Sequence, residues 1–193
     1  MTDKPCFPDR RATRLPGYNY SLPGAYFITS VTYHRICLFG EISAGGMHLS
    51  PFGHLVRRAW LDLPAHFEGI SLDAFCIMPN HIHGILFLHE EPGGSPLPGA
   101  DSENHHDLPG LTEINPAQTH PYQTISLTEI VRAFKTWSSR KINAARRTPG
   151  LPVWQRSFHD HIIRDDNDLE RVRNYIFENP MHWLEDEESG SVL

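Results

Sequence analysis

The sequence contains no long apolar run. No segment approaches the ~20 consecutive apolar residues that a membrane-spanning helix needs, and the opening segment MTDKPCFPDRRATR lacks the apolar core of a signal peptide. These absences predict a cytoplasmic protein that does not associate with membranes. The length of 193 residues fits one compact domain, with room for a loop or tail beyond it.

Cysteine is also scarce. The 3 cysteines, Cys6, Cys37 and Cys76, are far apart in the sequence, and no two of them form a CxxC pair. This number and spacing support neither a disulfide framework nor a zinc ribbon. We therefore expect reduced thiols.

Positive charge is missing from one long segment. Between His89 and Ile125 there are six acidic residues and no Lys or Arg, and four more acids follow Leu184. The whole chain has a net charge of -6, but without these ten acids 17 basic residues remain against 13 acidic ones. The rest of the chain therefore carries about +4, which is compatible with a phosphate-binding face or with ordinary mixed surface charge.

Composition divides the chain into a domain and its appendages. The segment 1–24 is basic and rich in turn residues, and we expect an irregular arm there. Residues 25–183 should form a single domain, interrupted at 89–125 by an acidic insertion, rich in Pro and Gly, that we expect to be disordered. An acidic tail occupies 184–193.

Hydrophobic periodicity predicts the elements of this domain. Segments dense in apolar and β-branched residues predict strands at 25–34, 70–78, 81–88 and 153–164, with a short hairpin at 40–50. Apolar residues at helical spacing predict helices at 52–67, from Ser126 onward and at 169–178. Ser126 and Glu129 have the spacing of a capping box, and Pro180 is expected to end the last helix.

The order βαββαβ followed by a helix predicts an α+β fold. This is the order of the ferredoxin-like arrangement, in which two helices cover one face of an antiparallel sheet and strands one and three are central. The third strand, 81–88, is apolar on both faces beyond its histidines, so its second face also needs a cover. The only element left is the additional C-terminal helix, which carries Tyr175.

Two histidines stand at the start of this central strand. Because side chains alternate along a strand, His81 and His83 project from the same face. In a chain with 13 histidines, an HxH triplet alone indicates a metal site only weakly. A metal held by His81, His83 and the Asn179 side-chain oxygen would keep positions open for water and phosphate oxygens, which suits Mg²⁺ or Mn²⁺.

Tyr175 lies one helical turn before Asn179 on the same helix face. A phenol is a poor nucleophile while it keeps its proton, and positive charge from the metal, Arg171 or Arg173 would favour phenolate and its attack on a phosphodiester. Alternatives stay open, since Tyr175 could simply pack on the sheet and Asn179 could simply end the helix.

A second HxH pair, His159 and His161, ranks below the first. It lies on the predicted edge strand and follows no tight turn. His161 could contact the metal ligands from outside or contact DNA, and ordinary packing on the strand is a further alternative.

Three longer segments carry a family resemblance: MPNHIHGILFL, VWQRSFHDHIIRDDNDLERVRNYIFENPMHW and RRATRLPGYNYSLPGAYFIT. Together they resemble the REP-associated tyrosine transposases, which belong to the single-tyrosine HUH transposases, from about residue 10 to residue 183. In this family the two histidines of the HUH motif match His81 and His83, and the nucleophilic tyrosine matches Tyr175. The polar third metal ligand matches Asn179.

The resemblance implies a DNA transposase. It would cleave single-stranded DNA near folded hairpins through a covalent 5′-phosphotyrosine intermediate, and the free 3′-hydroxyl could attack in a second step. The expected partner is single-stranded or hairpin DNA from repetitive extragenic palindromes, and a divalent metal is the only cofactor implied. A monomer or homodimer associated with the nucleoid is expected.

Phosphate contacts are expected from two basic regions of the chain. The first is the arm, and the second is the helix that begins at Ser126, which holds the densest basic run in the sequence. The residues are Arg10, Arg11 and Arg14 in the arm, and Arg132, Lys135, Arg140, Lys141, Arg146 and Arg147 in the helix.

Two other functions stay open at this stage. One is a domesticated protein that binds hairpin DNA without cleaving it, and the other is an HUH nickase of the replication-initiator or relaxase type. Nickases of that type usually have additional domains. The presence of every chemical residue favours cleavage over binding alone, and the acidic insertion is a departure from a minimal family member.

Overall fold

The computed structural model describes residues 15, 17–43, 46–90 and 125–189. The predicted arm residues Arg10, Arg11 and Arg14, most of the predicted insertion and the end of the acidic tail lie outside the described residues. The strands are β1 (Gly24–Val31), β2 (Gly40–Ser43), β3 (Gly46–Leu49), β4 (Ile70–Met78), β5 (His81–Leu88) and β6 (His159–Ile163). The helices are α1 (Pro51–Leu61), α2 (Leu127–Arg146) and α3 (Asp166–Ser189), with short 3₁₀ turns η1 (Tyr33–Arg35) and η2 (Leu63–Ala65).

The main sheet has four strands in the order β4-β5-β1-β6. Every neighbouring pair is antiparallel. This is the predicted α+β fold with ferredoxin-like strand order, and β1 and β5 occupy the centre as expected. The predicted hairpin at 40–50 is also present, as the separate two-stranded sheet of β2 and β3.

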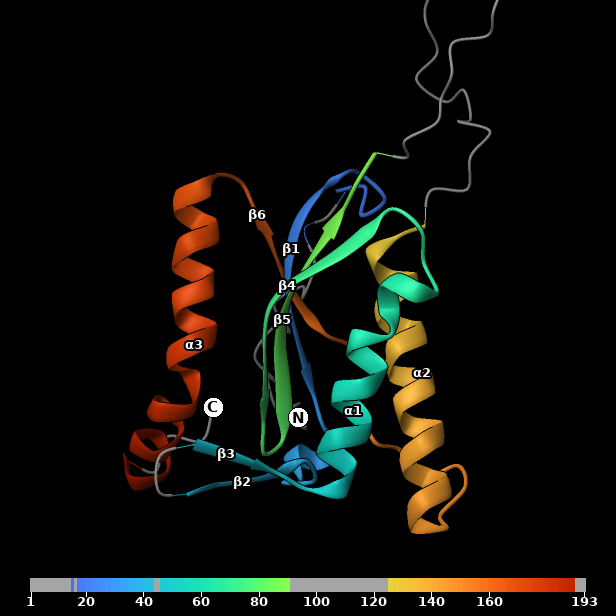
Figure 1. Ribbon diagram of the computed structural model, residues 1–193, viewed down its shortest axis with the longest axis vertical. Helices are drawn as coiled ribbons and strands as arrows, with labels where there is room; N and C mark the ends of the chain where they lie inside the picture. The colour runs from blue at the N-terminus through green and yellow to red at the C-terminus, as the bar shows by residue number, and fades with distance from the viewer. Residues whose placement is uncertain (1–14, 16, 44–45, 91–124, 190–193) are drawn as a thin grey trace, which may run out of the picture.

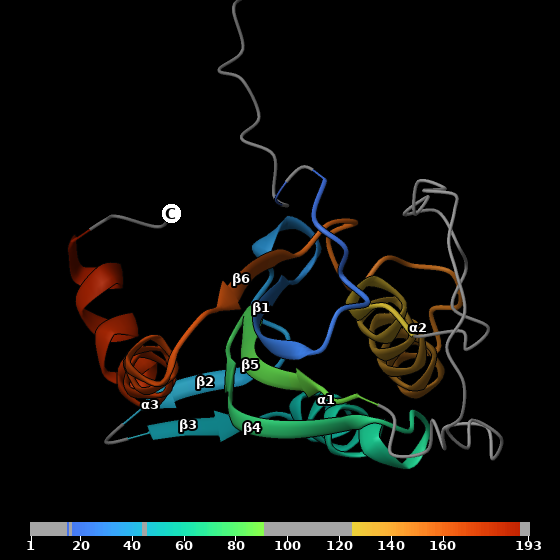
Figure 2. The same cartoon turned by 90° about the horizontal axis from the view of Figure 1, so that it is seen from above.

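The sheet is covered on both faces. Figure 1 shows α1 and α2 together on one side of the sheet and α3 on the other, and Figure 2 shows the same three layers from above. The larger core lies between the sheet and α1 with α2. The smaller one lies under α3, where Val172 and Ile176 pack with Ile85 of β5 and Ile163 of β6. The helix that carries Tyr175 therefore covers the second face, as the apolar character of β5 predicts.

A glycine beside the histidines allows this packing on the α1 side. Gly84 is buried in β5, and a Cβ atom built on it would lie 2.5 Å from Cζ2 of Trp60. Trp60 of α1 is fully buried and stacks on Phe75 of β4 with ring centroids 5.2 Å apart. The glycine that follows the HxH triplet thus makes room for a fully buried tryptophan.

The capping box that begins α2 is present as predicted. The Ser126 hydroxyl accepts from the Glu129 backbone N–H (3.3 Å), and the Glu129 carboxylate accepts from the Ser126 backbone N–H (3.0 Å). These two bonds satisfy donors that a helix start leaves unpaired. The basic residues of α2 are therefore presented on a helix with a defined first turn.

The last helix is longer than predicted. The prediction that Pro180 ends it was wrong, because α3 continues through Pro180 to Ser189. Proline inside a helix removes one backbone hydrogen bond and bends the axis, but it does not forbid further turns. In Figure 2 the first turns of α3 are seen end-on, whereas its last turns run across the view.

Three further boundaries differ from the prediction. The first helix ends at Leu61, where Pro64 falls in the 3₁₀ turn η2. The fourth strand is confined to β6, and the segment before it contributes only the isolated bridge between Thr32 and Trp154. The first strand ends at Val31 because the chain turns sharply at η1.

None of the helices formed by the described residues is long and apolar enough to cross a membrane.

Candidate active site

Two histidines converge on the face of the sheet that α3 covers. The Nε2 atoms of His81 and His83 lie 3.0 Å apart, and the ring centroids lie 4.6 Å apart. The strand begins at His81 directly after the turn at Pro79 and Asn80, and strand alternation places both rings on one face. The predicted pair is therefore brought together with one nitrogen of each ring directed at the same point.

The other ring nitrogens are fixed by neighbours. His83 Nδ1 lies 2.8 Å from Thr29 Oγ1, and Thr29 is its partner across the β1–β5 ladder. His81 Nδ1 lies 2.7 Å from the side-chain oxygen of Asn80. When Nδ1–H donates to these oxygens, the lone pair of each Nε2 is left for a metal.

Burial keeps both rings neutral. It lowers the pKa of His81 to about 4, with a smaller contribution from the charge of Arg35. It also lowers the pKa of His83 to about 3, with a smaller contribution from His81. Neutral imidazole is the form that binds metal ions, so both rings are in the ligand form at pH 7.

Tyr175 stands beside the histidine pair. Its ring centroid lies 5.3 Å from that of His83 and 5.9 Å from that of Phe27. Phe27 in turn stacks on His83 at 5.4 Å, so three rings from β1, β5 and α3 form one cluster. The side chain of Tyr175 is nonetheless 47% exposed, which leaves it open to a substrate as large as DNA.

Asn179 follows one helical turn after Tyr175 and is buried, at 8% exposure. One turn further along α3, the Trp183 ring lies 5.7 Å from the His81 ring. Asn179 therefore lies on the helix face between two residues that contact the histidines. The continuation of α3 beyond Pro180 is what brings Trp183 to His81, and this contact could not be predicted from a helix that ends at Pro180.

These residues fit a hard divalent cation better than a closed zinc site. The two converging neutral imidazoles could serve as two ligands, and a cation bound there would keep other positions for oxygen ligands. Among the residues that the structure describes, no group of three or more His, Cys, Asp or Glu is arranged to hold a metal. The predicted third ligand is the amide oxygen of Asn179, which is buried on α3, and its role as a ligand stays a prediction.

Two curated proteins of known sequence are similar to this chain. It is 36% identical over 179 residues to an uncharacterized protein of Haemophilus influenzae, covering 92% of each chain. It is 27% identical over 163 residues, 84% of this chain and 73% of the relative, to a protein of the same organism provisionally named a REP-associated tyrosine transposase. The chain thus resembles the REP-associated tyrosine transposases.

A solved structure has a similar fold. A solved structure of a REP-associated tyrosine transposase bound to a REP hairpin matches 88% of this chain and 73% of that chain, with a TM-score of 0.54 and 18% identity. No model of a protein family matches the sequence.

The arginines near Tyr175 are paired with acidic residues. Arg171 donates a hydrogen bond to the Asp168 carboxylate (2.5 Å). Arg173 donates two hydrogen bonds to the Asp73 carboxylate of β4, one from Nε (2.8 Å) and one from a terminal nitrogen (2.6 Å). The Arg171 guanidinium is the largest of the effects that hold the pKa of Asp168 at about 2. The Arg173 pair ties α3 to the edge of the sheet.

His161 belongs to the same acidic contact rather than to the histidine pair. Its Nε2 lies 2.8 Å from the Asp168 carboxylate at the start of α3. Asp168 thus joins β6 to α3 and accepts from both His161 and Arg171.

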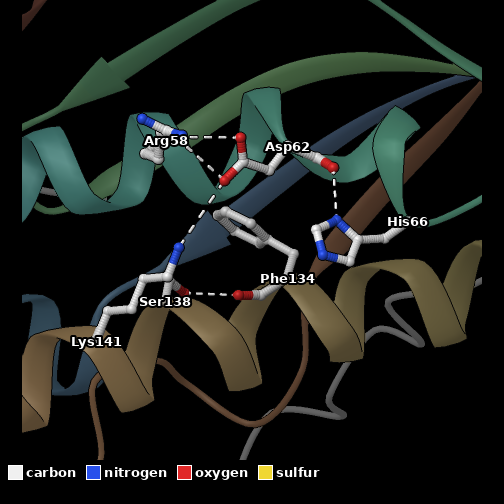
Figure 3. A network of polar contacts seen from close by, with 6 residues as sticks. All are labelled: Arg58, Asp62, His66, Phe134, Ser138 and Lys141. Carbon is white, nitrogen blue, oxygen red and sulfur yellow. Dashed lines mark hydrogen bonds and ion pairs between the residues drawn. The ribbon is translucent and has the colours of Figure 1, made fainter.

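The helix α2, which carries the predicted basic residues, lies on the opposite side of the sheet from α3, which carries Tyr175 (Figure 1). Three of them are engaged within the fold: Lys135 donates to the carbonyls of Gln155 and Ser157, Arg146 donates to Asn143 and Leu151, and Lys141 lies 3.9 Å from Asp62 of α1. Figure 3 shows that last contact, in which Asp62 lies between Arg58 and Lys141. The other three, Arg132, Arg140 and Arg147, are exposed.

Proposed function

We propose that this chain cleaves and rejoins single-stranded DNA beside a hairpin, with Tyr175 as the nucleophile. The observation that carries the proposal is the contact between the Tyr175 and His83 rings, which sets an exposed phenol beside two converging imidazoles. The solved relative bound to a REP hairpin supports hairpin DNA as the partner.

The chemistry conserves phosphodiester bonds. The Tyr175 oxygen, having lost its proton, attacks phosphorus, and the bond from phosphorus to the 3′-oxygen breaks. The leaving 3′-oxygen takes up a proton and becomes a 3′-hydroxyl, while the 5′-phosphate stays on the tyrosine. A 3′-hydroxyl then attacks the phosphotyrosine in the reverse sense, which rejoins DNA and frees the phenol without ATP.

We propose that His81, His83 and Asn179 hold a divalent cation, Mg²⁺ or Mn²⁺. When bound, the cation would supply positive charge that offsets the charge of the phosphate and favours phenolate. Thr29 and Asn80 hold the two imidazoles in the ligand orientation. Phe27 packs against both His83 and Tyr175 and so keeps the nucleophile beside the ligands.

We propose that the exposed basic residues of α2 bind DNA phosphates at a distance from the cleavage site at Tyr175. Arg132, Arg140 and Arg147 are exposed on α2, on the opposite side of the sheet from α3 (Figure 1). Contacts of this kind set the register of a bound strand without reading its sequence. Their role therefore concerns affinity rather than the cleavage step.

A covalent-capture assay tests the proposal. The protein is incubated with an end-labelled hairpin oligonucleotide that has single-stranded flanks and Mg²⁺ or Mn²⁺, and is then run on a denaturing gel. The wild type should give an adduct, and Tyr175→Phe and His81→Ala should give none. Tyr18→Phe, which likewise removes one phenol oxygen, should keep the adduct. Retention of the adduct by Tyr175→Phe would contradict the nucleophile assignment, and binding without any adduct would indicate a protein that only binds hairpins.

A further inference from the structure

A hollow with no assigned role lies at the end of β1. It has a volume of about 430 Å³ and is lined by Tyr33, His34, Arg35, Gln155 and Arg156. The lining contains two aromatic rings, two guanidinium groups and no acid. Aromatic faces beside cations are the groups that bind unpaired nucleotides, because a base stacks on the ring and its phosphate pairs with the cation.

The backbone of this turn adopts a costly conformation. His34 and Arg35 both have φ of 55°, in the left-handed region that L-residues rarely occupy. Two such residues in succession persist only where surrounding bonds hold them, and such strain gathers at functional sites. Here the Tyr33 N–H donates to the Val153 carbonyl (2.8 Å) and the Thr32 hydroxyl donates to the Ile36 carbonyl (2.9 Å).

The aromatic side chains of this turn are accessible to solvent. Tyr33 is 41% exposed, and its ring centroid lies 4.0 Å from that of His34. The two ring planes are tilted by 57°, so a base that stacks flat on Tyr33 would meet the His34 ring at an angle. An exposed aromatic pair on a rigid turn can therefore hold a planar base without reordering the protein.

One buried amide joins this turn to the histidine pair. Asn80 is 5% exposed, and its side-chain nitrogen donates to the Arg35 carbonyl (3.2 Å) while its side-chain oxygen contacts His81 Nδ1 (2.7 Å). The same side chain thus fixes the position of the turn and the orientation of a proposed metal ligand. A nucleotide on the turn would sit in a fixed relation to the cleavage site.

The hollow also continues toward the basic face of α2. A groove of about 640 Å³ between α2 and the segment 150–158 shares Gln155 and Arg156 with it, and includes Arg132 and Arg140. The shared residues are held against β1, since the Gln155 N–H donates to the Val31 carbonyl (2.9 Å). The two hollows thus form one cationic path from α2 to the end of the sheet where His81 lies.

From this arrangement we infer that the Tyr33–Arg35 turn, together with Arg156, binds one unpaired nucleotide of the DNA strand beside the cleavage position. The base stacks on the ring of Tyr33 and contacts His34 at an angle, and the phosphate pairs with Arg156. The inference rests on the proposed function for the identity of the substrate. It adds a positioning site that neither the HxH motif nor the tyrosine helix contains.

The test measures binding in EDTA by fluorescence anisotropy with two probes. One is a labelled hairpin oligonucleotide with a short single-stranded extension, and the other is the same hairpin with a blunt end. Tyr33→Ala should weaken binding of the extended hairpin by about tenfold, the effect of removing one stacked base, and leave the blunt hairpin unchanged. Tyr33→Phe keeps the ring and should bind both probes as the wild type does.

Two further variants guard against a folding artefact. His34→Gly removes a ring but suits a positive φ, so the melting temperature should not fall, whereas affinity for the extended hairpin should. Arg156→Ala should reduce the slope of log K against log salt by about 0.7, the value for one phosphate on a single strand. Arg57→Ala, at an exposed arginine of α1, should leave that slope unchanged.

Either of two results would overturn the inference. One is unchanged affinity of both Tyr33→Ala and His34→Gly for the extended hairpin. The other is an equal loss on the blunt hairpin, which would place the turn on duplex DNA. Because the assay contains no metal and needs no cleavage, a missing covalent adduct would contradict the proposed function without altering this result.

Discussion

At the scale of the residue, the site depends on two side chains that orient the histidines. Thr29 and Asn80 each bond an Nδ1 atom and leave Nε2 toward the shared point. Strand alternation predicted that His81 and His83 share one face, and the topology and the family resemblance supplied their predicted role as ligands. The sequence could not indicate Thr29, because that contact depends on the register between β1 and β5, which lie far apart in the chain.

Replacing Thr29 by valine tests this orienting role. Thr29→Val keeps the shape of the side chain but removes the oxygen 2.8 Å from His83 Nδ1. We expect Mn²⁺ affinity to fall by about 10- to 100-fold, the usual cost of losing an outer partner of a ligand. Titration of Mn²⁺ binding measures it, and Thr136→Val on α2 is the matched control. Unchanged affinity in Thr29→Val would show that Thr29 does not orient the ligand.

At the scale of the element, packing around β5 decides whether the histidines keep their place. The sequence predicted both strands of the β4–β5 hairpin, because apolar density and a Pro-Asn turn are local signals. It did not explain Gly84, since the reason is Trp60 on a different element. It also placed the end of α3 too early, because Pro180 bends the helix without ending it.

A larger residue at position 84 should therefore destabilise the sheet. Gly84→Ala places a methyl group against Trp60, and overpacking of this kind costs about 1–3 kcal/mol. Urea unfolding measures the loss. The same change made on a Trp60→Phe background, where the smaller ring leaves space, should cost clearly less. An equal loss in the free energy of unfolding on the two backgrounds would show that the alanine methyl group does not clash with Trp60.

The attachment of α3 to β4 gives a prediction that depends on pH. The bond from Arg173 lowers the pKa of Asp73 below its usual range. A carboxyl group whose pKa is lower in the folded state stabilises the fold above its unfolded pKa, ~3.9, and this contribution is lost as pH falls through the folded value. Because the pair is partly exposed, we expect it to contribute about 0.5–1 kcal/mol to the free energy of unfolding.

Asp73→Asn should therefore be less stable than the wild type at pH 7, and the difference should shrink in strong acid. Unfolding by urea at a series of pH values measures it. Glu170→Gln is the control, since Glu170 makes only a 3.7 Å contact with Arg173. A difference that persists at the acid end would assign the effect to packing rather than to the ion pair.

At the scale of the whole molecule, the site exists because the two faces of the sheet have different covers. Strand order and the need to bury both faces of β5 were predictable from the pattern of elements. The cationic path around the end of the sheet was not, because the turn at Tyr33, the segment 150–158 and α2 meet only in the folded chain. The result is a molecule with the proposed chemistry on one face and the exposed arginines of α2 on the other.

The most direct test of the central claim is to find the atom that holds the DNA. The adduct formed with a flanked hairpin oligonucleotide and Mn²⁺ is digested with nuclease and protease, and the remaining phosphopeptide is sequenced by mass spectrometry. We predict a 5′-phosphate on the hydroxyl oxygen of Tyr175. A phosphate found reproducibly on any other side chain would contradict the claim that Tyr175, beside His81 and His83, is the nucleophile.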